Sequence, residues 1–244
     1  QVSFVLMDQS TGAIKALVGG RDDNTHTNRA KDYLRQPGTE LSLLSAYLPA
    51  VDTAGMTLGS VINDEEYYYP DTQEQVIDRY ESYRGLCTLR ESVADTINVN
   101  SVKTLDFVTP KVGYDYLKNL GFSSLTDGYS PESGQSDTDI ALPMALGVLR
   151  RGVSNLELTA AYATVANGGT YKKPYFYTKI FDKSGAEILS KNETYNKRVM
   201  KESTAWLITD AIKVGDDENE RPYSGISFGE SDMAIAGVSG SDEK

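Results

Sequence analysis

Few residues in this chain could carry chemistry by themselves. One histidine, His26, and one cysteine, Cys87, leave no material for a histidine-rich metal centre, a cysteine-based zinc site or an internal disulfide. A Ser-His-Asp triad would have to include His26, which lies in a polar stretch typical of a surface loop. The neighbouring carboxylates of Asp64–Glu66 and Asp216–Glu218 also lie in polar runs, which favours solvated faces over acid–base pairs. We therefore expect no metal and no cofactor.

The common motifs of nucleophilic and phosphate-binding sites are missing from the sequence. No phosphate-binding G-x-x-x-x-G-K and no G-x-S-x-G nucleophile motif occurs, and the pair Gly19–Gly20 follows a strand-like run without opening a helix. The one literal Ser-x-x-Lys runs from Ser241 to Lys244, at the end of the sequence, where we interpret it as a chance match.

The elements that must position a site are strands near both ends of the chain with helices between them. Turn residues and apolar runs predict hairpins over 2–18 and 175–189 and a last strand over 233–238. Apolar spacing predicts helices, and the capping box Ser154–Glu157 marks the start of the clearest one. The predicted helices cover 39–51 (with Thr39 as a possible N-cap and Pro49 near its end), 89–95, 99–107, 110–120, 158–165 and 202–214, and residues 56–88 are expected to be irregular.

Composition limits the partners. The chain has 244 residues and a formal net charge of −11, which opposes binding to nucleic acid or to an anionic membrane surface through a basic face. No run approaches the ~18 consecutive apolar residues of a membrane-spanning helix. The sequence starts inside a strand-like run, so we expect a piece cut from a longer protein.

Several segments, taken in order, resemble the transpeptidase domain of class A penicillin-binding proteins, the bifunctional peptidoglycan synthases. The resemblance covers nearly the whole chain, and it rests on segments that keep the family's order and sensible spacing. The segments are Asp8–Gly20, Asn28–Ala30, Arg35–Gly38, Leu89–Asn98, Leu156–Ala163, Ala166–Gly169 and Ile235–Ser241.

The resemblance implies an α/β fold of the penicillin-recognising transpeptidase or serine β-lactamase type, with a central antiparallel sheet flanked by helices and a helical lobe. We expect one domain over 1–244, incomplete at its C-terminus relative to the family. Its sheet lobe would cover roughly 1–34 and 170–244 and its helical lobe roughly 35–169. The family reaction acylates a serine with a D-Ala-D-Ala stem peptide, releases D-Ala and passes the acyl group to an amine. Penicillins trap the same acyl-enzyme.

The same resemblance assigns the site, and this chain departs from the family at all three motifs. In the first motif, Ser-x-x-Lys, the serine position is Thr39 and the lysine position is Ser42. The second motif, Ser-x-Asn, corresponds to Thr96, Ile97 and Asn98. The third motif, Lys-Thr-Gly, would bind substrate and corresponds to Val238, Ser239 and Gly240, followed by Ser241.

These departures favour an inactive site. Thr39 keeps a hydroxyl, but its β-methyl group restricts χ1 and crowds attack. Ser42 cannot act as the base that an amine of tuned pKa provides, and losing a general base costs ~10²–10⁴ in rate. Val238 removes a positive charge from the position where the substrate carboxylate should dock.

Two hypotheses therefore stay open. The first is a non-catalytic binding or scaffolding domain, in which Asn98 and Ser239–Ser241 keep a peptide-shaped groove or merely persist as scaffold. The second is a residual D,D-transpeptidase or carboxypeptidase that acylates Thr39 with an unrecognised base, for instance Lys103. The expected partners are a stem peptide or β-lactam, a glycosyltransferase domain N-terminal in the parent protein, and cell-wall, division or sporulation proteins. The resemblance places the parent on the outer face of the cytoplasmic membrane, anchored by an N-terminal segment absent from this chain.

Overall fold

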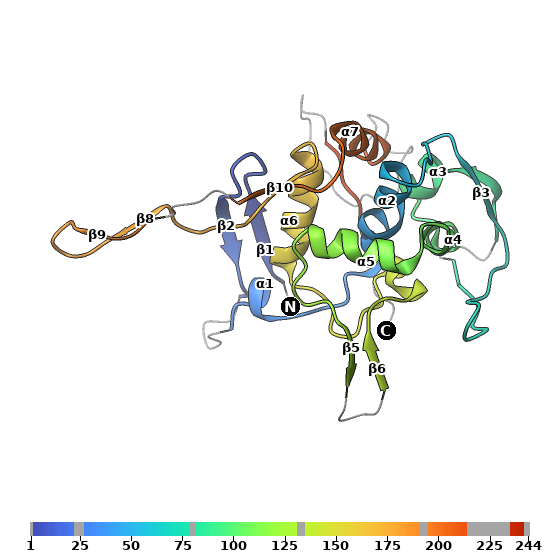
Figure 1. Ribbon diagram of the computed structural model, residues 1–244, viewed down its shortest axis with the longest axis horizontal. Helices are drawn as coiled ribbons and strands as arrows, with labels where there is room; N and C mark the ends of the chain where they lie inside the picture. Colours follow the sequence, from blue (N-terminus) through green and yellow to red (C-terminus); the bar gives the residue numbers. More distant parts are fainter. Residues whose placement is uncertain are drawn as a thin grey trace.

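The computed structural model of the chain describes residues 2–21, 27–78, 82–130, 135–190, 195–213 and 235–241. His26, the acidic run Asp216–Glu218 and the start of the predicted last strand lie outside the described residues. Helices gather at the centre of the molecule and hairpins lie at its edges (Figure 1).

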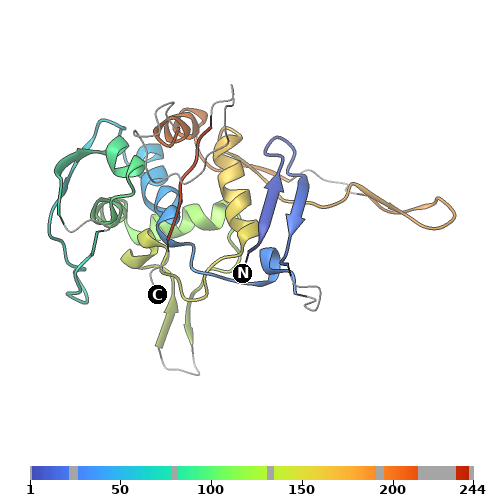
Figure 2. The ribbon, with the colours of Figure 1, turned by 180° about the vertical axis from the view of Figure 1, so that it is seen from behind.

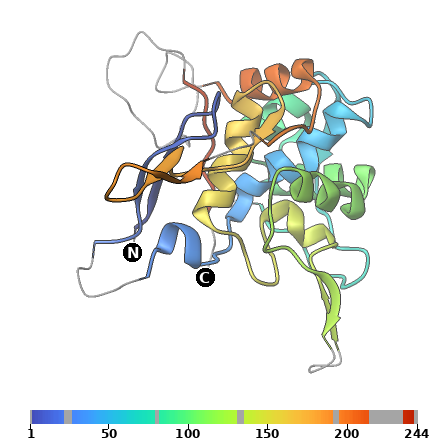
Figure 3. The same cartoon turned by 60° about the vertical axis from the view of Figure 1, so that its left-hand side comes forward.

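The predicted N-terminal hairpin is confirmed. Strands β1 (Phe4–Met7) and β2 (Ile14–Val18) pair antiparallel, with Phe4 opposite Val18. Gly12 takes a φ of +86° in the connecting turn, a conformation that glycine adopts without steric cost. One side of this hairpin lies beside helix α6 (Asn155–Ala166), as Figure 3 shows.

Helix α6 begins at the capping box that the sequence predicts. The Ser154 side chain accepts a hydrogen bond from the backbone N–H of Glu157, and the Glu157 carboxylate accepts one from the backbone N–H of Ser154. The same carboxylate also accepts hydrogen bonds from Ser123 and Ser124. The other helices are α1 (Arg29–Asp32), η1 (Gly38–Glu40), η2 (Leu43–Tyr47), α2 (Leu48–Asp52), α3 (Leu89–Ala94), α4 (Asn98–Val108), α5 (Pro110–Asn119), η3 (Leu142–Leu146) and α7 (Glu202–Ala211).

The apolar core lies where η2, α2, α4, α5 and η3 meet, with α6 and α7 against it. Its fully buried side chains include those of Leu44, Leu105, Leu117, Met144 and Ile208. Because η2 follows directly on the first motif, the residues that follow Ser42 are part of the core rather than a surface loop.

The single helix predicted over 39–51 is instead three consecutive pieces. A 3-10 turn, η1, comes first, then the π-helical turn η2, then α2, in which Pro49 lies in the first turn and needs no backbone donor. Thr39 lies inside η1 and its side chain forms no cap, so the prediction of Thr39 as an N-cap is wrong. Gly38, with a φ of +76°, turns the chain just before it.

The described strands form five two-stranded antiparallel sheets. The hairpin of β3 (Val61–Asp64) and β4 (Gly85–Thr88) falls in the stretch expected to be irregular, so that prediction is wrong there. The other pairs are β5 (Asp127–Ser130) with β6 (Gln135–Thr138), β7 (Thr170–Lys172) with β10 (Asn196–Arg198), and β8 (Lys179–Phe181) with β9 (Glu187–Ser190). The last pair confirms the hairpin predicted near residues 175–189.

Residues 235–241, here called the terminal run, pass along α6 on the side seen in Figure 2. Ala236 bridges to Lys213, and the N–H of Gly237 donates to the carbonyl of Ile212 at 3.0 Å. Within the described residues the terminal run forms no ladder with β1 or β2, so the sheet expected from the first hairpin and last strands is represented here by separate pairs.

Candidate active site

The first-motif turn, residues 37–42, presents two hydroxyls on successive turns. Thr39 is half-buried, and Ser42, which the resemblance assigns to the position of the family lysine, is 4% exposed. Among the described residues, neither hydroxyl has a hydrogen-bond partner. A hydroxyl pair of this kind offers a nucleophile with no base attached to it.

The structure brings the third motif against the first. A Cβ atom on Gly240 would lie 2.8 Å from the carbonyl oxygen of Pro37 and 2.9 Å from the backbone nitrogen of Glu40. A Cβ atom on Gly38 would lie 2.5 Å from the carbonyl oxygen of Ser241. Both glycines therefore permit backbone contact between segments far apart in sequence, as the motif alignment requires. Val238 is half-buried, whereas Ser239, Gly240 and Ser241 are exposed.

A loop after η3 holds the first-motif turn from another side. The side-chain amide of Gln36 donates to the carbonyl of Leu149 at 2.6 Å, and the N–H of Leu149 donates to the Gln36 Oε1 atom at 2.7 Å. A Cβ atom on Gly147 would lie 2.2 Å from the carbonyl oxygen of Gly38. The position of Thr39 is thus fixed mainly by backbone contacts of its neighbours.

The second motif lies where α3 leads into α4. Thr96 has a φ of +53°, unusual for a β-branched residue, and Asn98 is the first residue of α4. Helix α4 packs on η2, where the hydroxyls of Tyr47 and Ser101 lie 3.0 Å apart in the core. The structure therefore joins the second motif to the first through this packing, and no described hydrogen bond joins their polar side chains directly.

The candidate base Lys103 is committed elsewhere. Its ammonium donates to the carbonyl of Asn63 at 2.7 Å and to the Glu65 carboxylate at 2.9 Å, both near the end of β3. It also lies 5.3 Å from the centre of the Tyr67 ring. Lys103 thus contacts the β3–β4 hairpin, and no described contact joins it to Thr39.

Glu40, directly after Thr39, lines the site and is not among the residues that the sequence analysis singles out. Burial raises the pKa of its carboxyl to about 7. Its backbone carbonyl accepts a hydrogen bond from the Tyr162 hydroxyl at 2.8 Å, which ties the first-motif turn to α6. The position of this glutamate directly before the apolar run that starts at Leu41 could have indicated that it is buried.

A cavity of about 610 Å³ opens behind the first-motif turn, between β1, α6 and the terminal run. Its lining is largely apolar, with Leu158 and Tyr162 from α6 and Val5 from β1. Of the eight predicted site positions only Val238 lines it, together with Glu40. The cavity is therefore distinct from the hydroxyls of Thr39 and Ser42.

The described residues contain no group of three or more histidine, cysteine, aspartate or glutamate side chains placed to hold a metal ion. None of the helices that the structure describes is long and apolar enough to cross a bilayer.

Comparison with known proteins identifies the family to which the chain belongs. The sequence profile of the penicillin binding protein transpeptidase domain matches residues 2–243. Penicillin-binding protein 1F of Bacillus subtilis is 30% identical over 243 residues, which covers 98% of this chain and 32% of that protein. Penicillin-binding protein 1A of Aquifex aeolicus is 38% identical over 199 residues, covering 78% of this chain and 24% of that protein. The chain thus spans about a third or less of these relatives.

Solved structures show the same fold. Penicillin-binding protein 1A from Haemophilus influenzae superposes with a TM-score of 0.71 at 24% identity, covering 85% of this chain and 34% of that one. PonA1 from Mycobacterium tuberculosis, in complex with penicillin V, superposes with a TM-score of 0.71 at 18% identity, covering 86% and 54%. These likenesses confirm the penicillin-recognising α/β fold that the sequence predicts. With the profile match, they show that the chain belongs to the transpeptidase domain family of the class A penicillin-binding proteins.

Proposed function

We propose that this domain binds peptidoglycan stem peptides without forming an acyl-enzyme, and that it acts as a binding or scaffolding domain of its parent synthase. The observation that carries this proposal is Ser42, a buried hydroxyl one turn after Thr39 in place of an amine. The one other amine that the sequence suggested, Lys103, is bound to Asn63 and Glu65.

The chemistry of acyl transfer explains why a serine at position 42 argues against an acyl-enzyme. For acyl transfer the hydroxyl proton must leave as the oxygen attacks the D-Ala carbonyl, and the base must then return a proton to the departing D-Ala amine. A serine hydroxyl has a pKa far too high to accept that proton near neutral pH. Thr39 would have to attack as a neutral hydroxyl, with its β-methyl group crowding the approach.

Binding needs less than catalysis does. A peptide that lies along the terminal run would use the backbone groups of residues 239–241, which are exposed and lie against the first-motif turn. Val238 weakens the attraction for a substrate carboxylate, so we expect modest affinity. Val238→Lys should tighten binding of a D-Ala-D-Ala peptide by about tenfold, since a charge-assisted hydrogen bond contributes ~1.5 kcal/mol or more.

The parent protein follows from the relatives. We infer that it carries a glycosyltransferase domain N-terminal to this one and lies outside the cytoplasmic membrane on an N-terminal anchor. There the domain would position stem peptides or a cell-wall or division protein for its neighbour. Nucleic acid is not an expected partner, given the net charge of −11.

A residual D,D-transpeptidase or carboxypeptidase is the second candidate. The half-buried Thr39 hydroxyl favours it, because this hydroxyl lies in the turn that the terminal run contacts and has no hydrogen-bond partner among the described residues. An acyl group on Thr39 would be its direct signature.

Intact-protein mass spectrometry after incubation with excess penicillin separates the two candidates. We expect no mass increase in the wild-type protein, in Thr39→Ala or in Lys103→Met, with circular dichroism showing that all three are folded. An adduct on the wild-type protein that Thr39→Ala abolishes would overturn the proposal. Loss of that adduct in Lys103→Met as well would identify the base.

A further inference from the structure

Hairpin β8–β9 extends away from the body of the molecule, as Figures 1 and 2 show from opposite sides. Every residue from 176 to 189 is exposed, so neither face of this two-stranded ribbon is covered by the rest of the chain. A two-stranded hairpin by itself is only marginally stable in water. Hairpin β8–β9 therefore lacks the packing that usually stabilises such an element.

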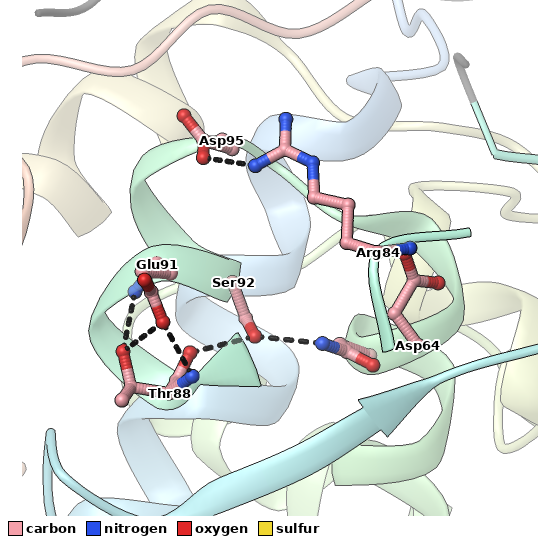
Figure 4. A network of polar contacts seen from close by, with 7 residues as sticks. Asp64, Arg84, Thr88, Glu91, Ser92 and Asp95 are labelled. Carbon is pink, nitrogen blue, oxygen red and sulfur yellow. Dashed lines mark hydrogen bonds and ion pairs between the residues drawn. The ribbon is translucent and has the colours of Figure 1, made fainter. Parts of the chain in front are cut away.

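Hairpin β3–β4 shows how a hairpin is held when it packs on the body. Side chains from both of its strands are buried, and β3 packs against α4. The Asp64 carboxylate accepts the backbone N–H of Arg84 at 2.8 Å, and the Arg84 guanidinium pairs with Asp95 at the end of α3 (Figure 4). In hairpin β8–β9, by contrast, the described ion pair between Lys179 and Glu187 joins the hairpin's own two strands.

Both faces of hairpin β8–β9 carry apolar side chains. Ile180 lies opposite Leu189 in the register, so these two side chains share one face, and Phe181 points to the other face. A single protein surface laid against this ribbon would cover one face and leave apolar side chains exposed on the other. The large apolar side chains of the hairpin and its base, each between 36% and 59% exposed, are those of Phe176, Tyr177, Ile180, Phe181, Ile188 and Leu189.

The hairpin and its base also carry the opposite charge from the chain as a whole. Residues 172–190 contain four lysines and two acidic residues, whereas the whole chain contains 24 basic and 35 acidic residues. Both acids have partners inside the hairpin, because Glu187 is in the ion pair described above and the Asp182 carboxylate accepts hydrogen bonds from backbone N–H groups of its own turn. Lys173 and Lys183 are exposed and form no ion pair among the described residues. The hairpin thus presents an excess of positive charge.

We propose that hairpin β8–β9 binds an anionic lipid surface, with its apolar side chains among the headgroups and its lysines on the lipid phosphates. Aromatic side chains and lysines are the groups that favour the interface between an anionic membrane and water. Lipid headgroups can surround a ribbon and so cover both of its faces, which a single folded partner cannot do. The inference goes beyond the proposed function and does not depend on peptide binding.

The geometry limits how deep the hairpin can lie. Its turn contains the charged residues Asp182 and Lys183, and within the described residues the outer edges of β8 and β9 have no strand partner. Charges and unpaired backbone groups are costly in hydrocarbon, so the hairpin lies in the headgroup layer.

The net charge of −11 opposes membrane binding by the chain as a whole, and the reach of the hairpin reduces this effect. An extended segment rises ~3.3 Å per residue, so residues 176–181 span up to ~15 Å, beyond the ~8 Å over which charges act at physiological ionic strength. The hairpin can therefore meet a lipid surface while the acidic body stays outside the range of strong repulsion.

Flotation of the 244-residue chain with lipid vesicles tests the proposal. We expect binding to vesicles of equal parts phosphatidylglycerol and phosphatidylcholine, none to phosphatidylcholine alone, and loss of binding as the salt concentration rises. The double variant Lys173→Gln, Lys183→Gln should bind about twentyfold more weakly, because each lysine near an anionic surface contributes about fivefold. Lys118→Gln, which changes an exposed lysine of α5, is the matched control and should bind like the wild type.

A tryptophan placed in the hairpin locates the contact without weakening it. The native Trp206 is exposed on α7, so Trp206→Phe supplies a background free of tryptophan fluorescence. In that background, vesicles brominated close to the headgroup should quench the fluorescence of Phe181→Trp. Phe107→Trp, which changes an exposed aromatic residue of α4, should not be quenched. Circular dichroism checks that every variant is folded.

Absence of binding to the anionic vesicles overturns the inference, as does equal binding to both kinds of vesicle. Binding that the double lysine variant leaves unchanged, or quenching of Phe107→Trp in place of Phe181→Trp, would move the contact to another surface and overturn it too. Sedimentation without lipid tests a second copy of the chain as the occupant. A dimer that the double lysine variant dissociates would show that another copy covers the ribbon, which also overturns the inference.

Discussion

The first-motif turn (residues 37–42) and the second-motif loop (residues 95–99) lie on neighbouring elements, yet different kinds of contact hold them. Around Thr39 the contacts are close approaches of backbone, made possible by Gly38, Gly147 and Gly240. Around Asn98 they are side-chain hydrogen bonds, made by Asp78 and its neighbours. The contacts around Thr39 are possible because the glycines have no Cβ atom, whereas the contacts around Asn98 include a carboxylate.

This difference concerns the side chains of the two segments. Among the described residues the hydroxyls of Thr39 and Ser42 form no hydrogen bond, so the described contacts of the first-motif turn do not depend on them. Asn98 is different, because its backbone and its amide are both bonded to residues 77–78. We infer that Asn98 has a structural role at the start of α4.

The largest expected effect comes from adding a Cβ atom to the first-motif turn. Gly38→Ala combines a φ of +76° with contacts of 2.5 Å to Ser241, whereas Gly55→Ala has nearly the same φ of +77° and nothing within 4 Å. The left-handed conformation alone costs ~1–2 kcal/mol, and the clash adds ~1–3 kcal/mol. Urea unfolding should therefore show Gly38→Ala clearly below Gly55→Ala. Equal losses would mean that the terminal run moves aside freely.

A smaller effect concerns Glu40 and Asp78, the two carboxyl groups near these segments whose pKa is raised. The pKa of Glu40 is about 7 because of burial alone, against an ordinary value of 4.5. The protonated form therefore favours the fold: the contribution is complete below pH 4.5 and is lost as the pH rises through about 7. The wild-type free energy of unfolding should fall relative to Glu40→Gln by ~2 kcal/mol between pH 4.5 and 8.

Asp78 titrates in the same range and with the same sign, so the readout is the difference between wild type and Glu40→Gln at each pH, not the slope of either protein. Parallel stability curves for the two proteins would show that Glu40 is solvated in the native state.

The smallest effect concerns the link between the two regions. Because Ser101 Oγ donates to the Ile97 carbonyl at 2.9 Å, Tyr47 is the donor in the bond between their hydroxyls. Tyr47→Phe should cost ~1 kcal/mol in thermal or urea unfolding, the usual net value of a buried hydrogen bond. Tyr68→Phe, which loses an exposed bond to Glu66, should cost much less. An equal loss of stability in Tyr47→Phe and Tyr68→Phe would mean that the hydrogen bond between Tyr47 and Ser101 contributes nothing to stability.

The sequence predicted those helices and hairpins whose formation depends on residues close together in the chain. The capping box at Ser154, the N-terminal hairpin and the helices between residues 89 and 120 depend on residues a few positions apart, and the structure contains them. The β3–β4 hairpin was missed because its partners, such as Ile62 and Cys87, are distant in sequence and joined by polar, tyrosine-rich chain.

The candidate site likewise has features that the sequence predicts and features that it does not. The motif order assigns residues 37–42 and 238–241 to one site, and residues 37–40 and 240–241 approach each other closely in the structure. The roles of Thr39, Ser42, Thr96 and Asn98 stay predictions, as do those of residues 238–241. Burial of Glu40 and the hydrogen bonds from the backbone of residues 98–99 to Asp78 could not be predicted, because each depends on segments that meet only in the folded chain.

The contacts around the first-motif turn also set the order in which the chain can fold. Gln36 bonds to a residue 113 positions away, and the Glu40 carbonyl to one 122 positions away. Contacts of such high sequence separation form late, after hairpins and helices whose partners are near neighbours. A ribosome would release the turn that bears Thr39 long before the chain that secures it. The first-motif turn is therefore among the last parts of this domain to reach its final contacts.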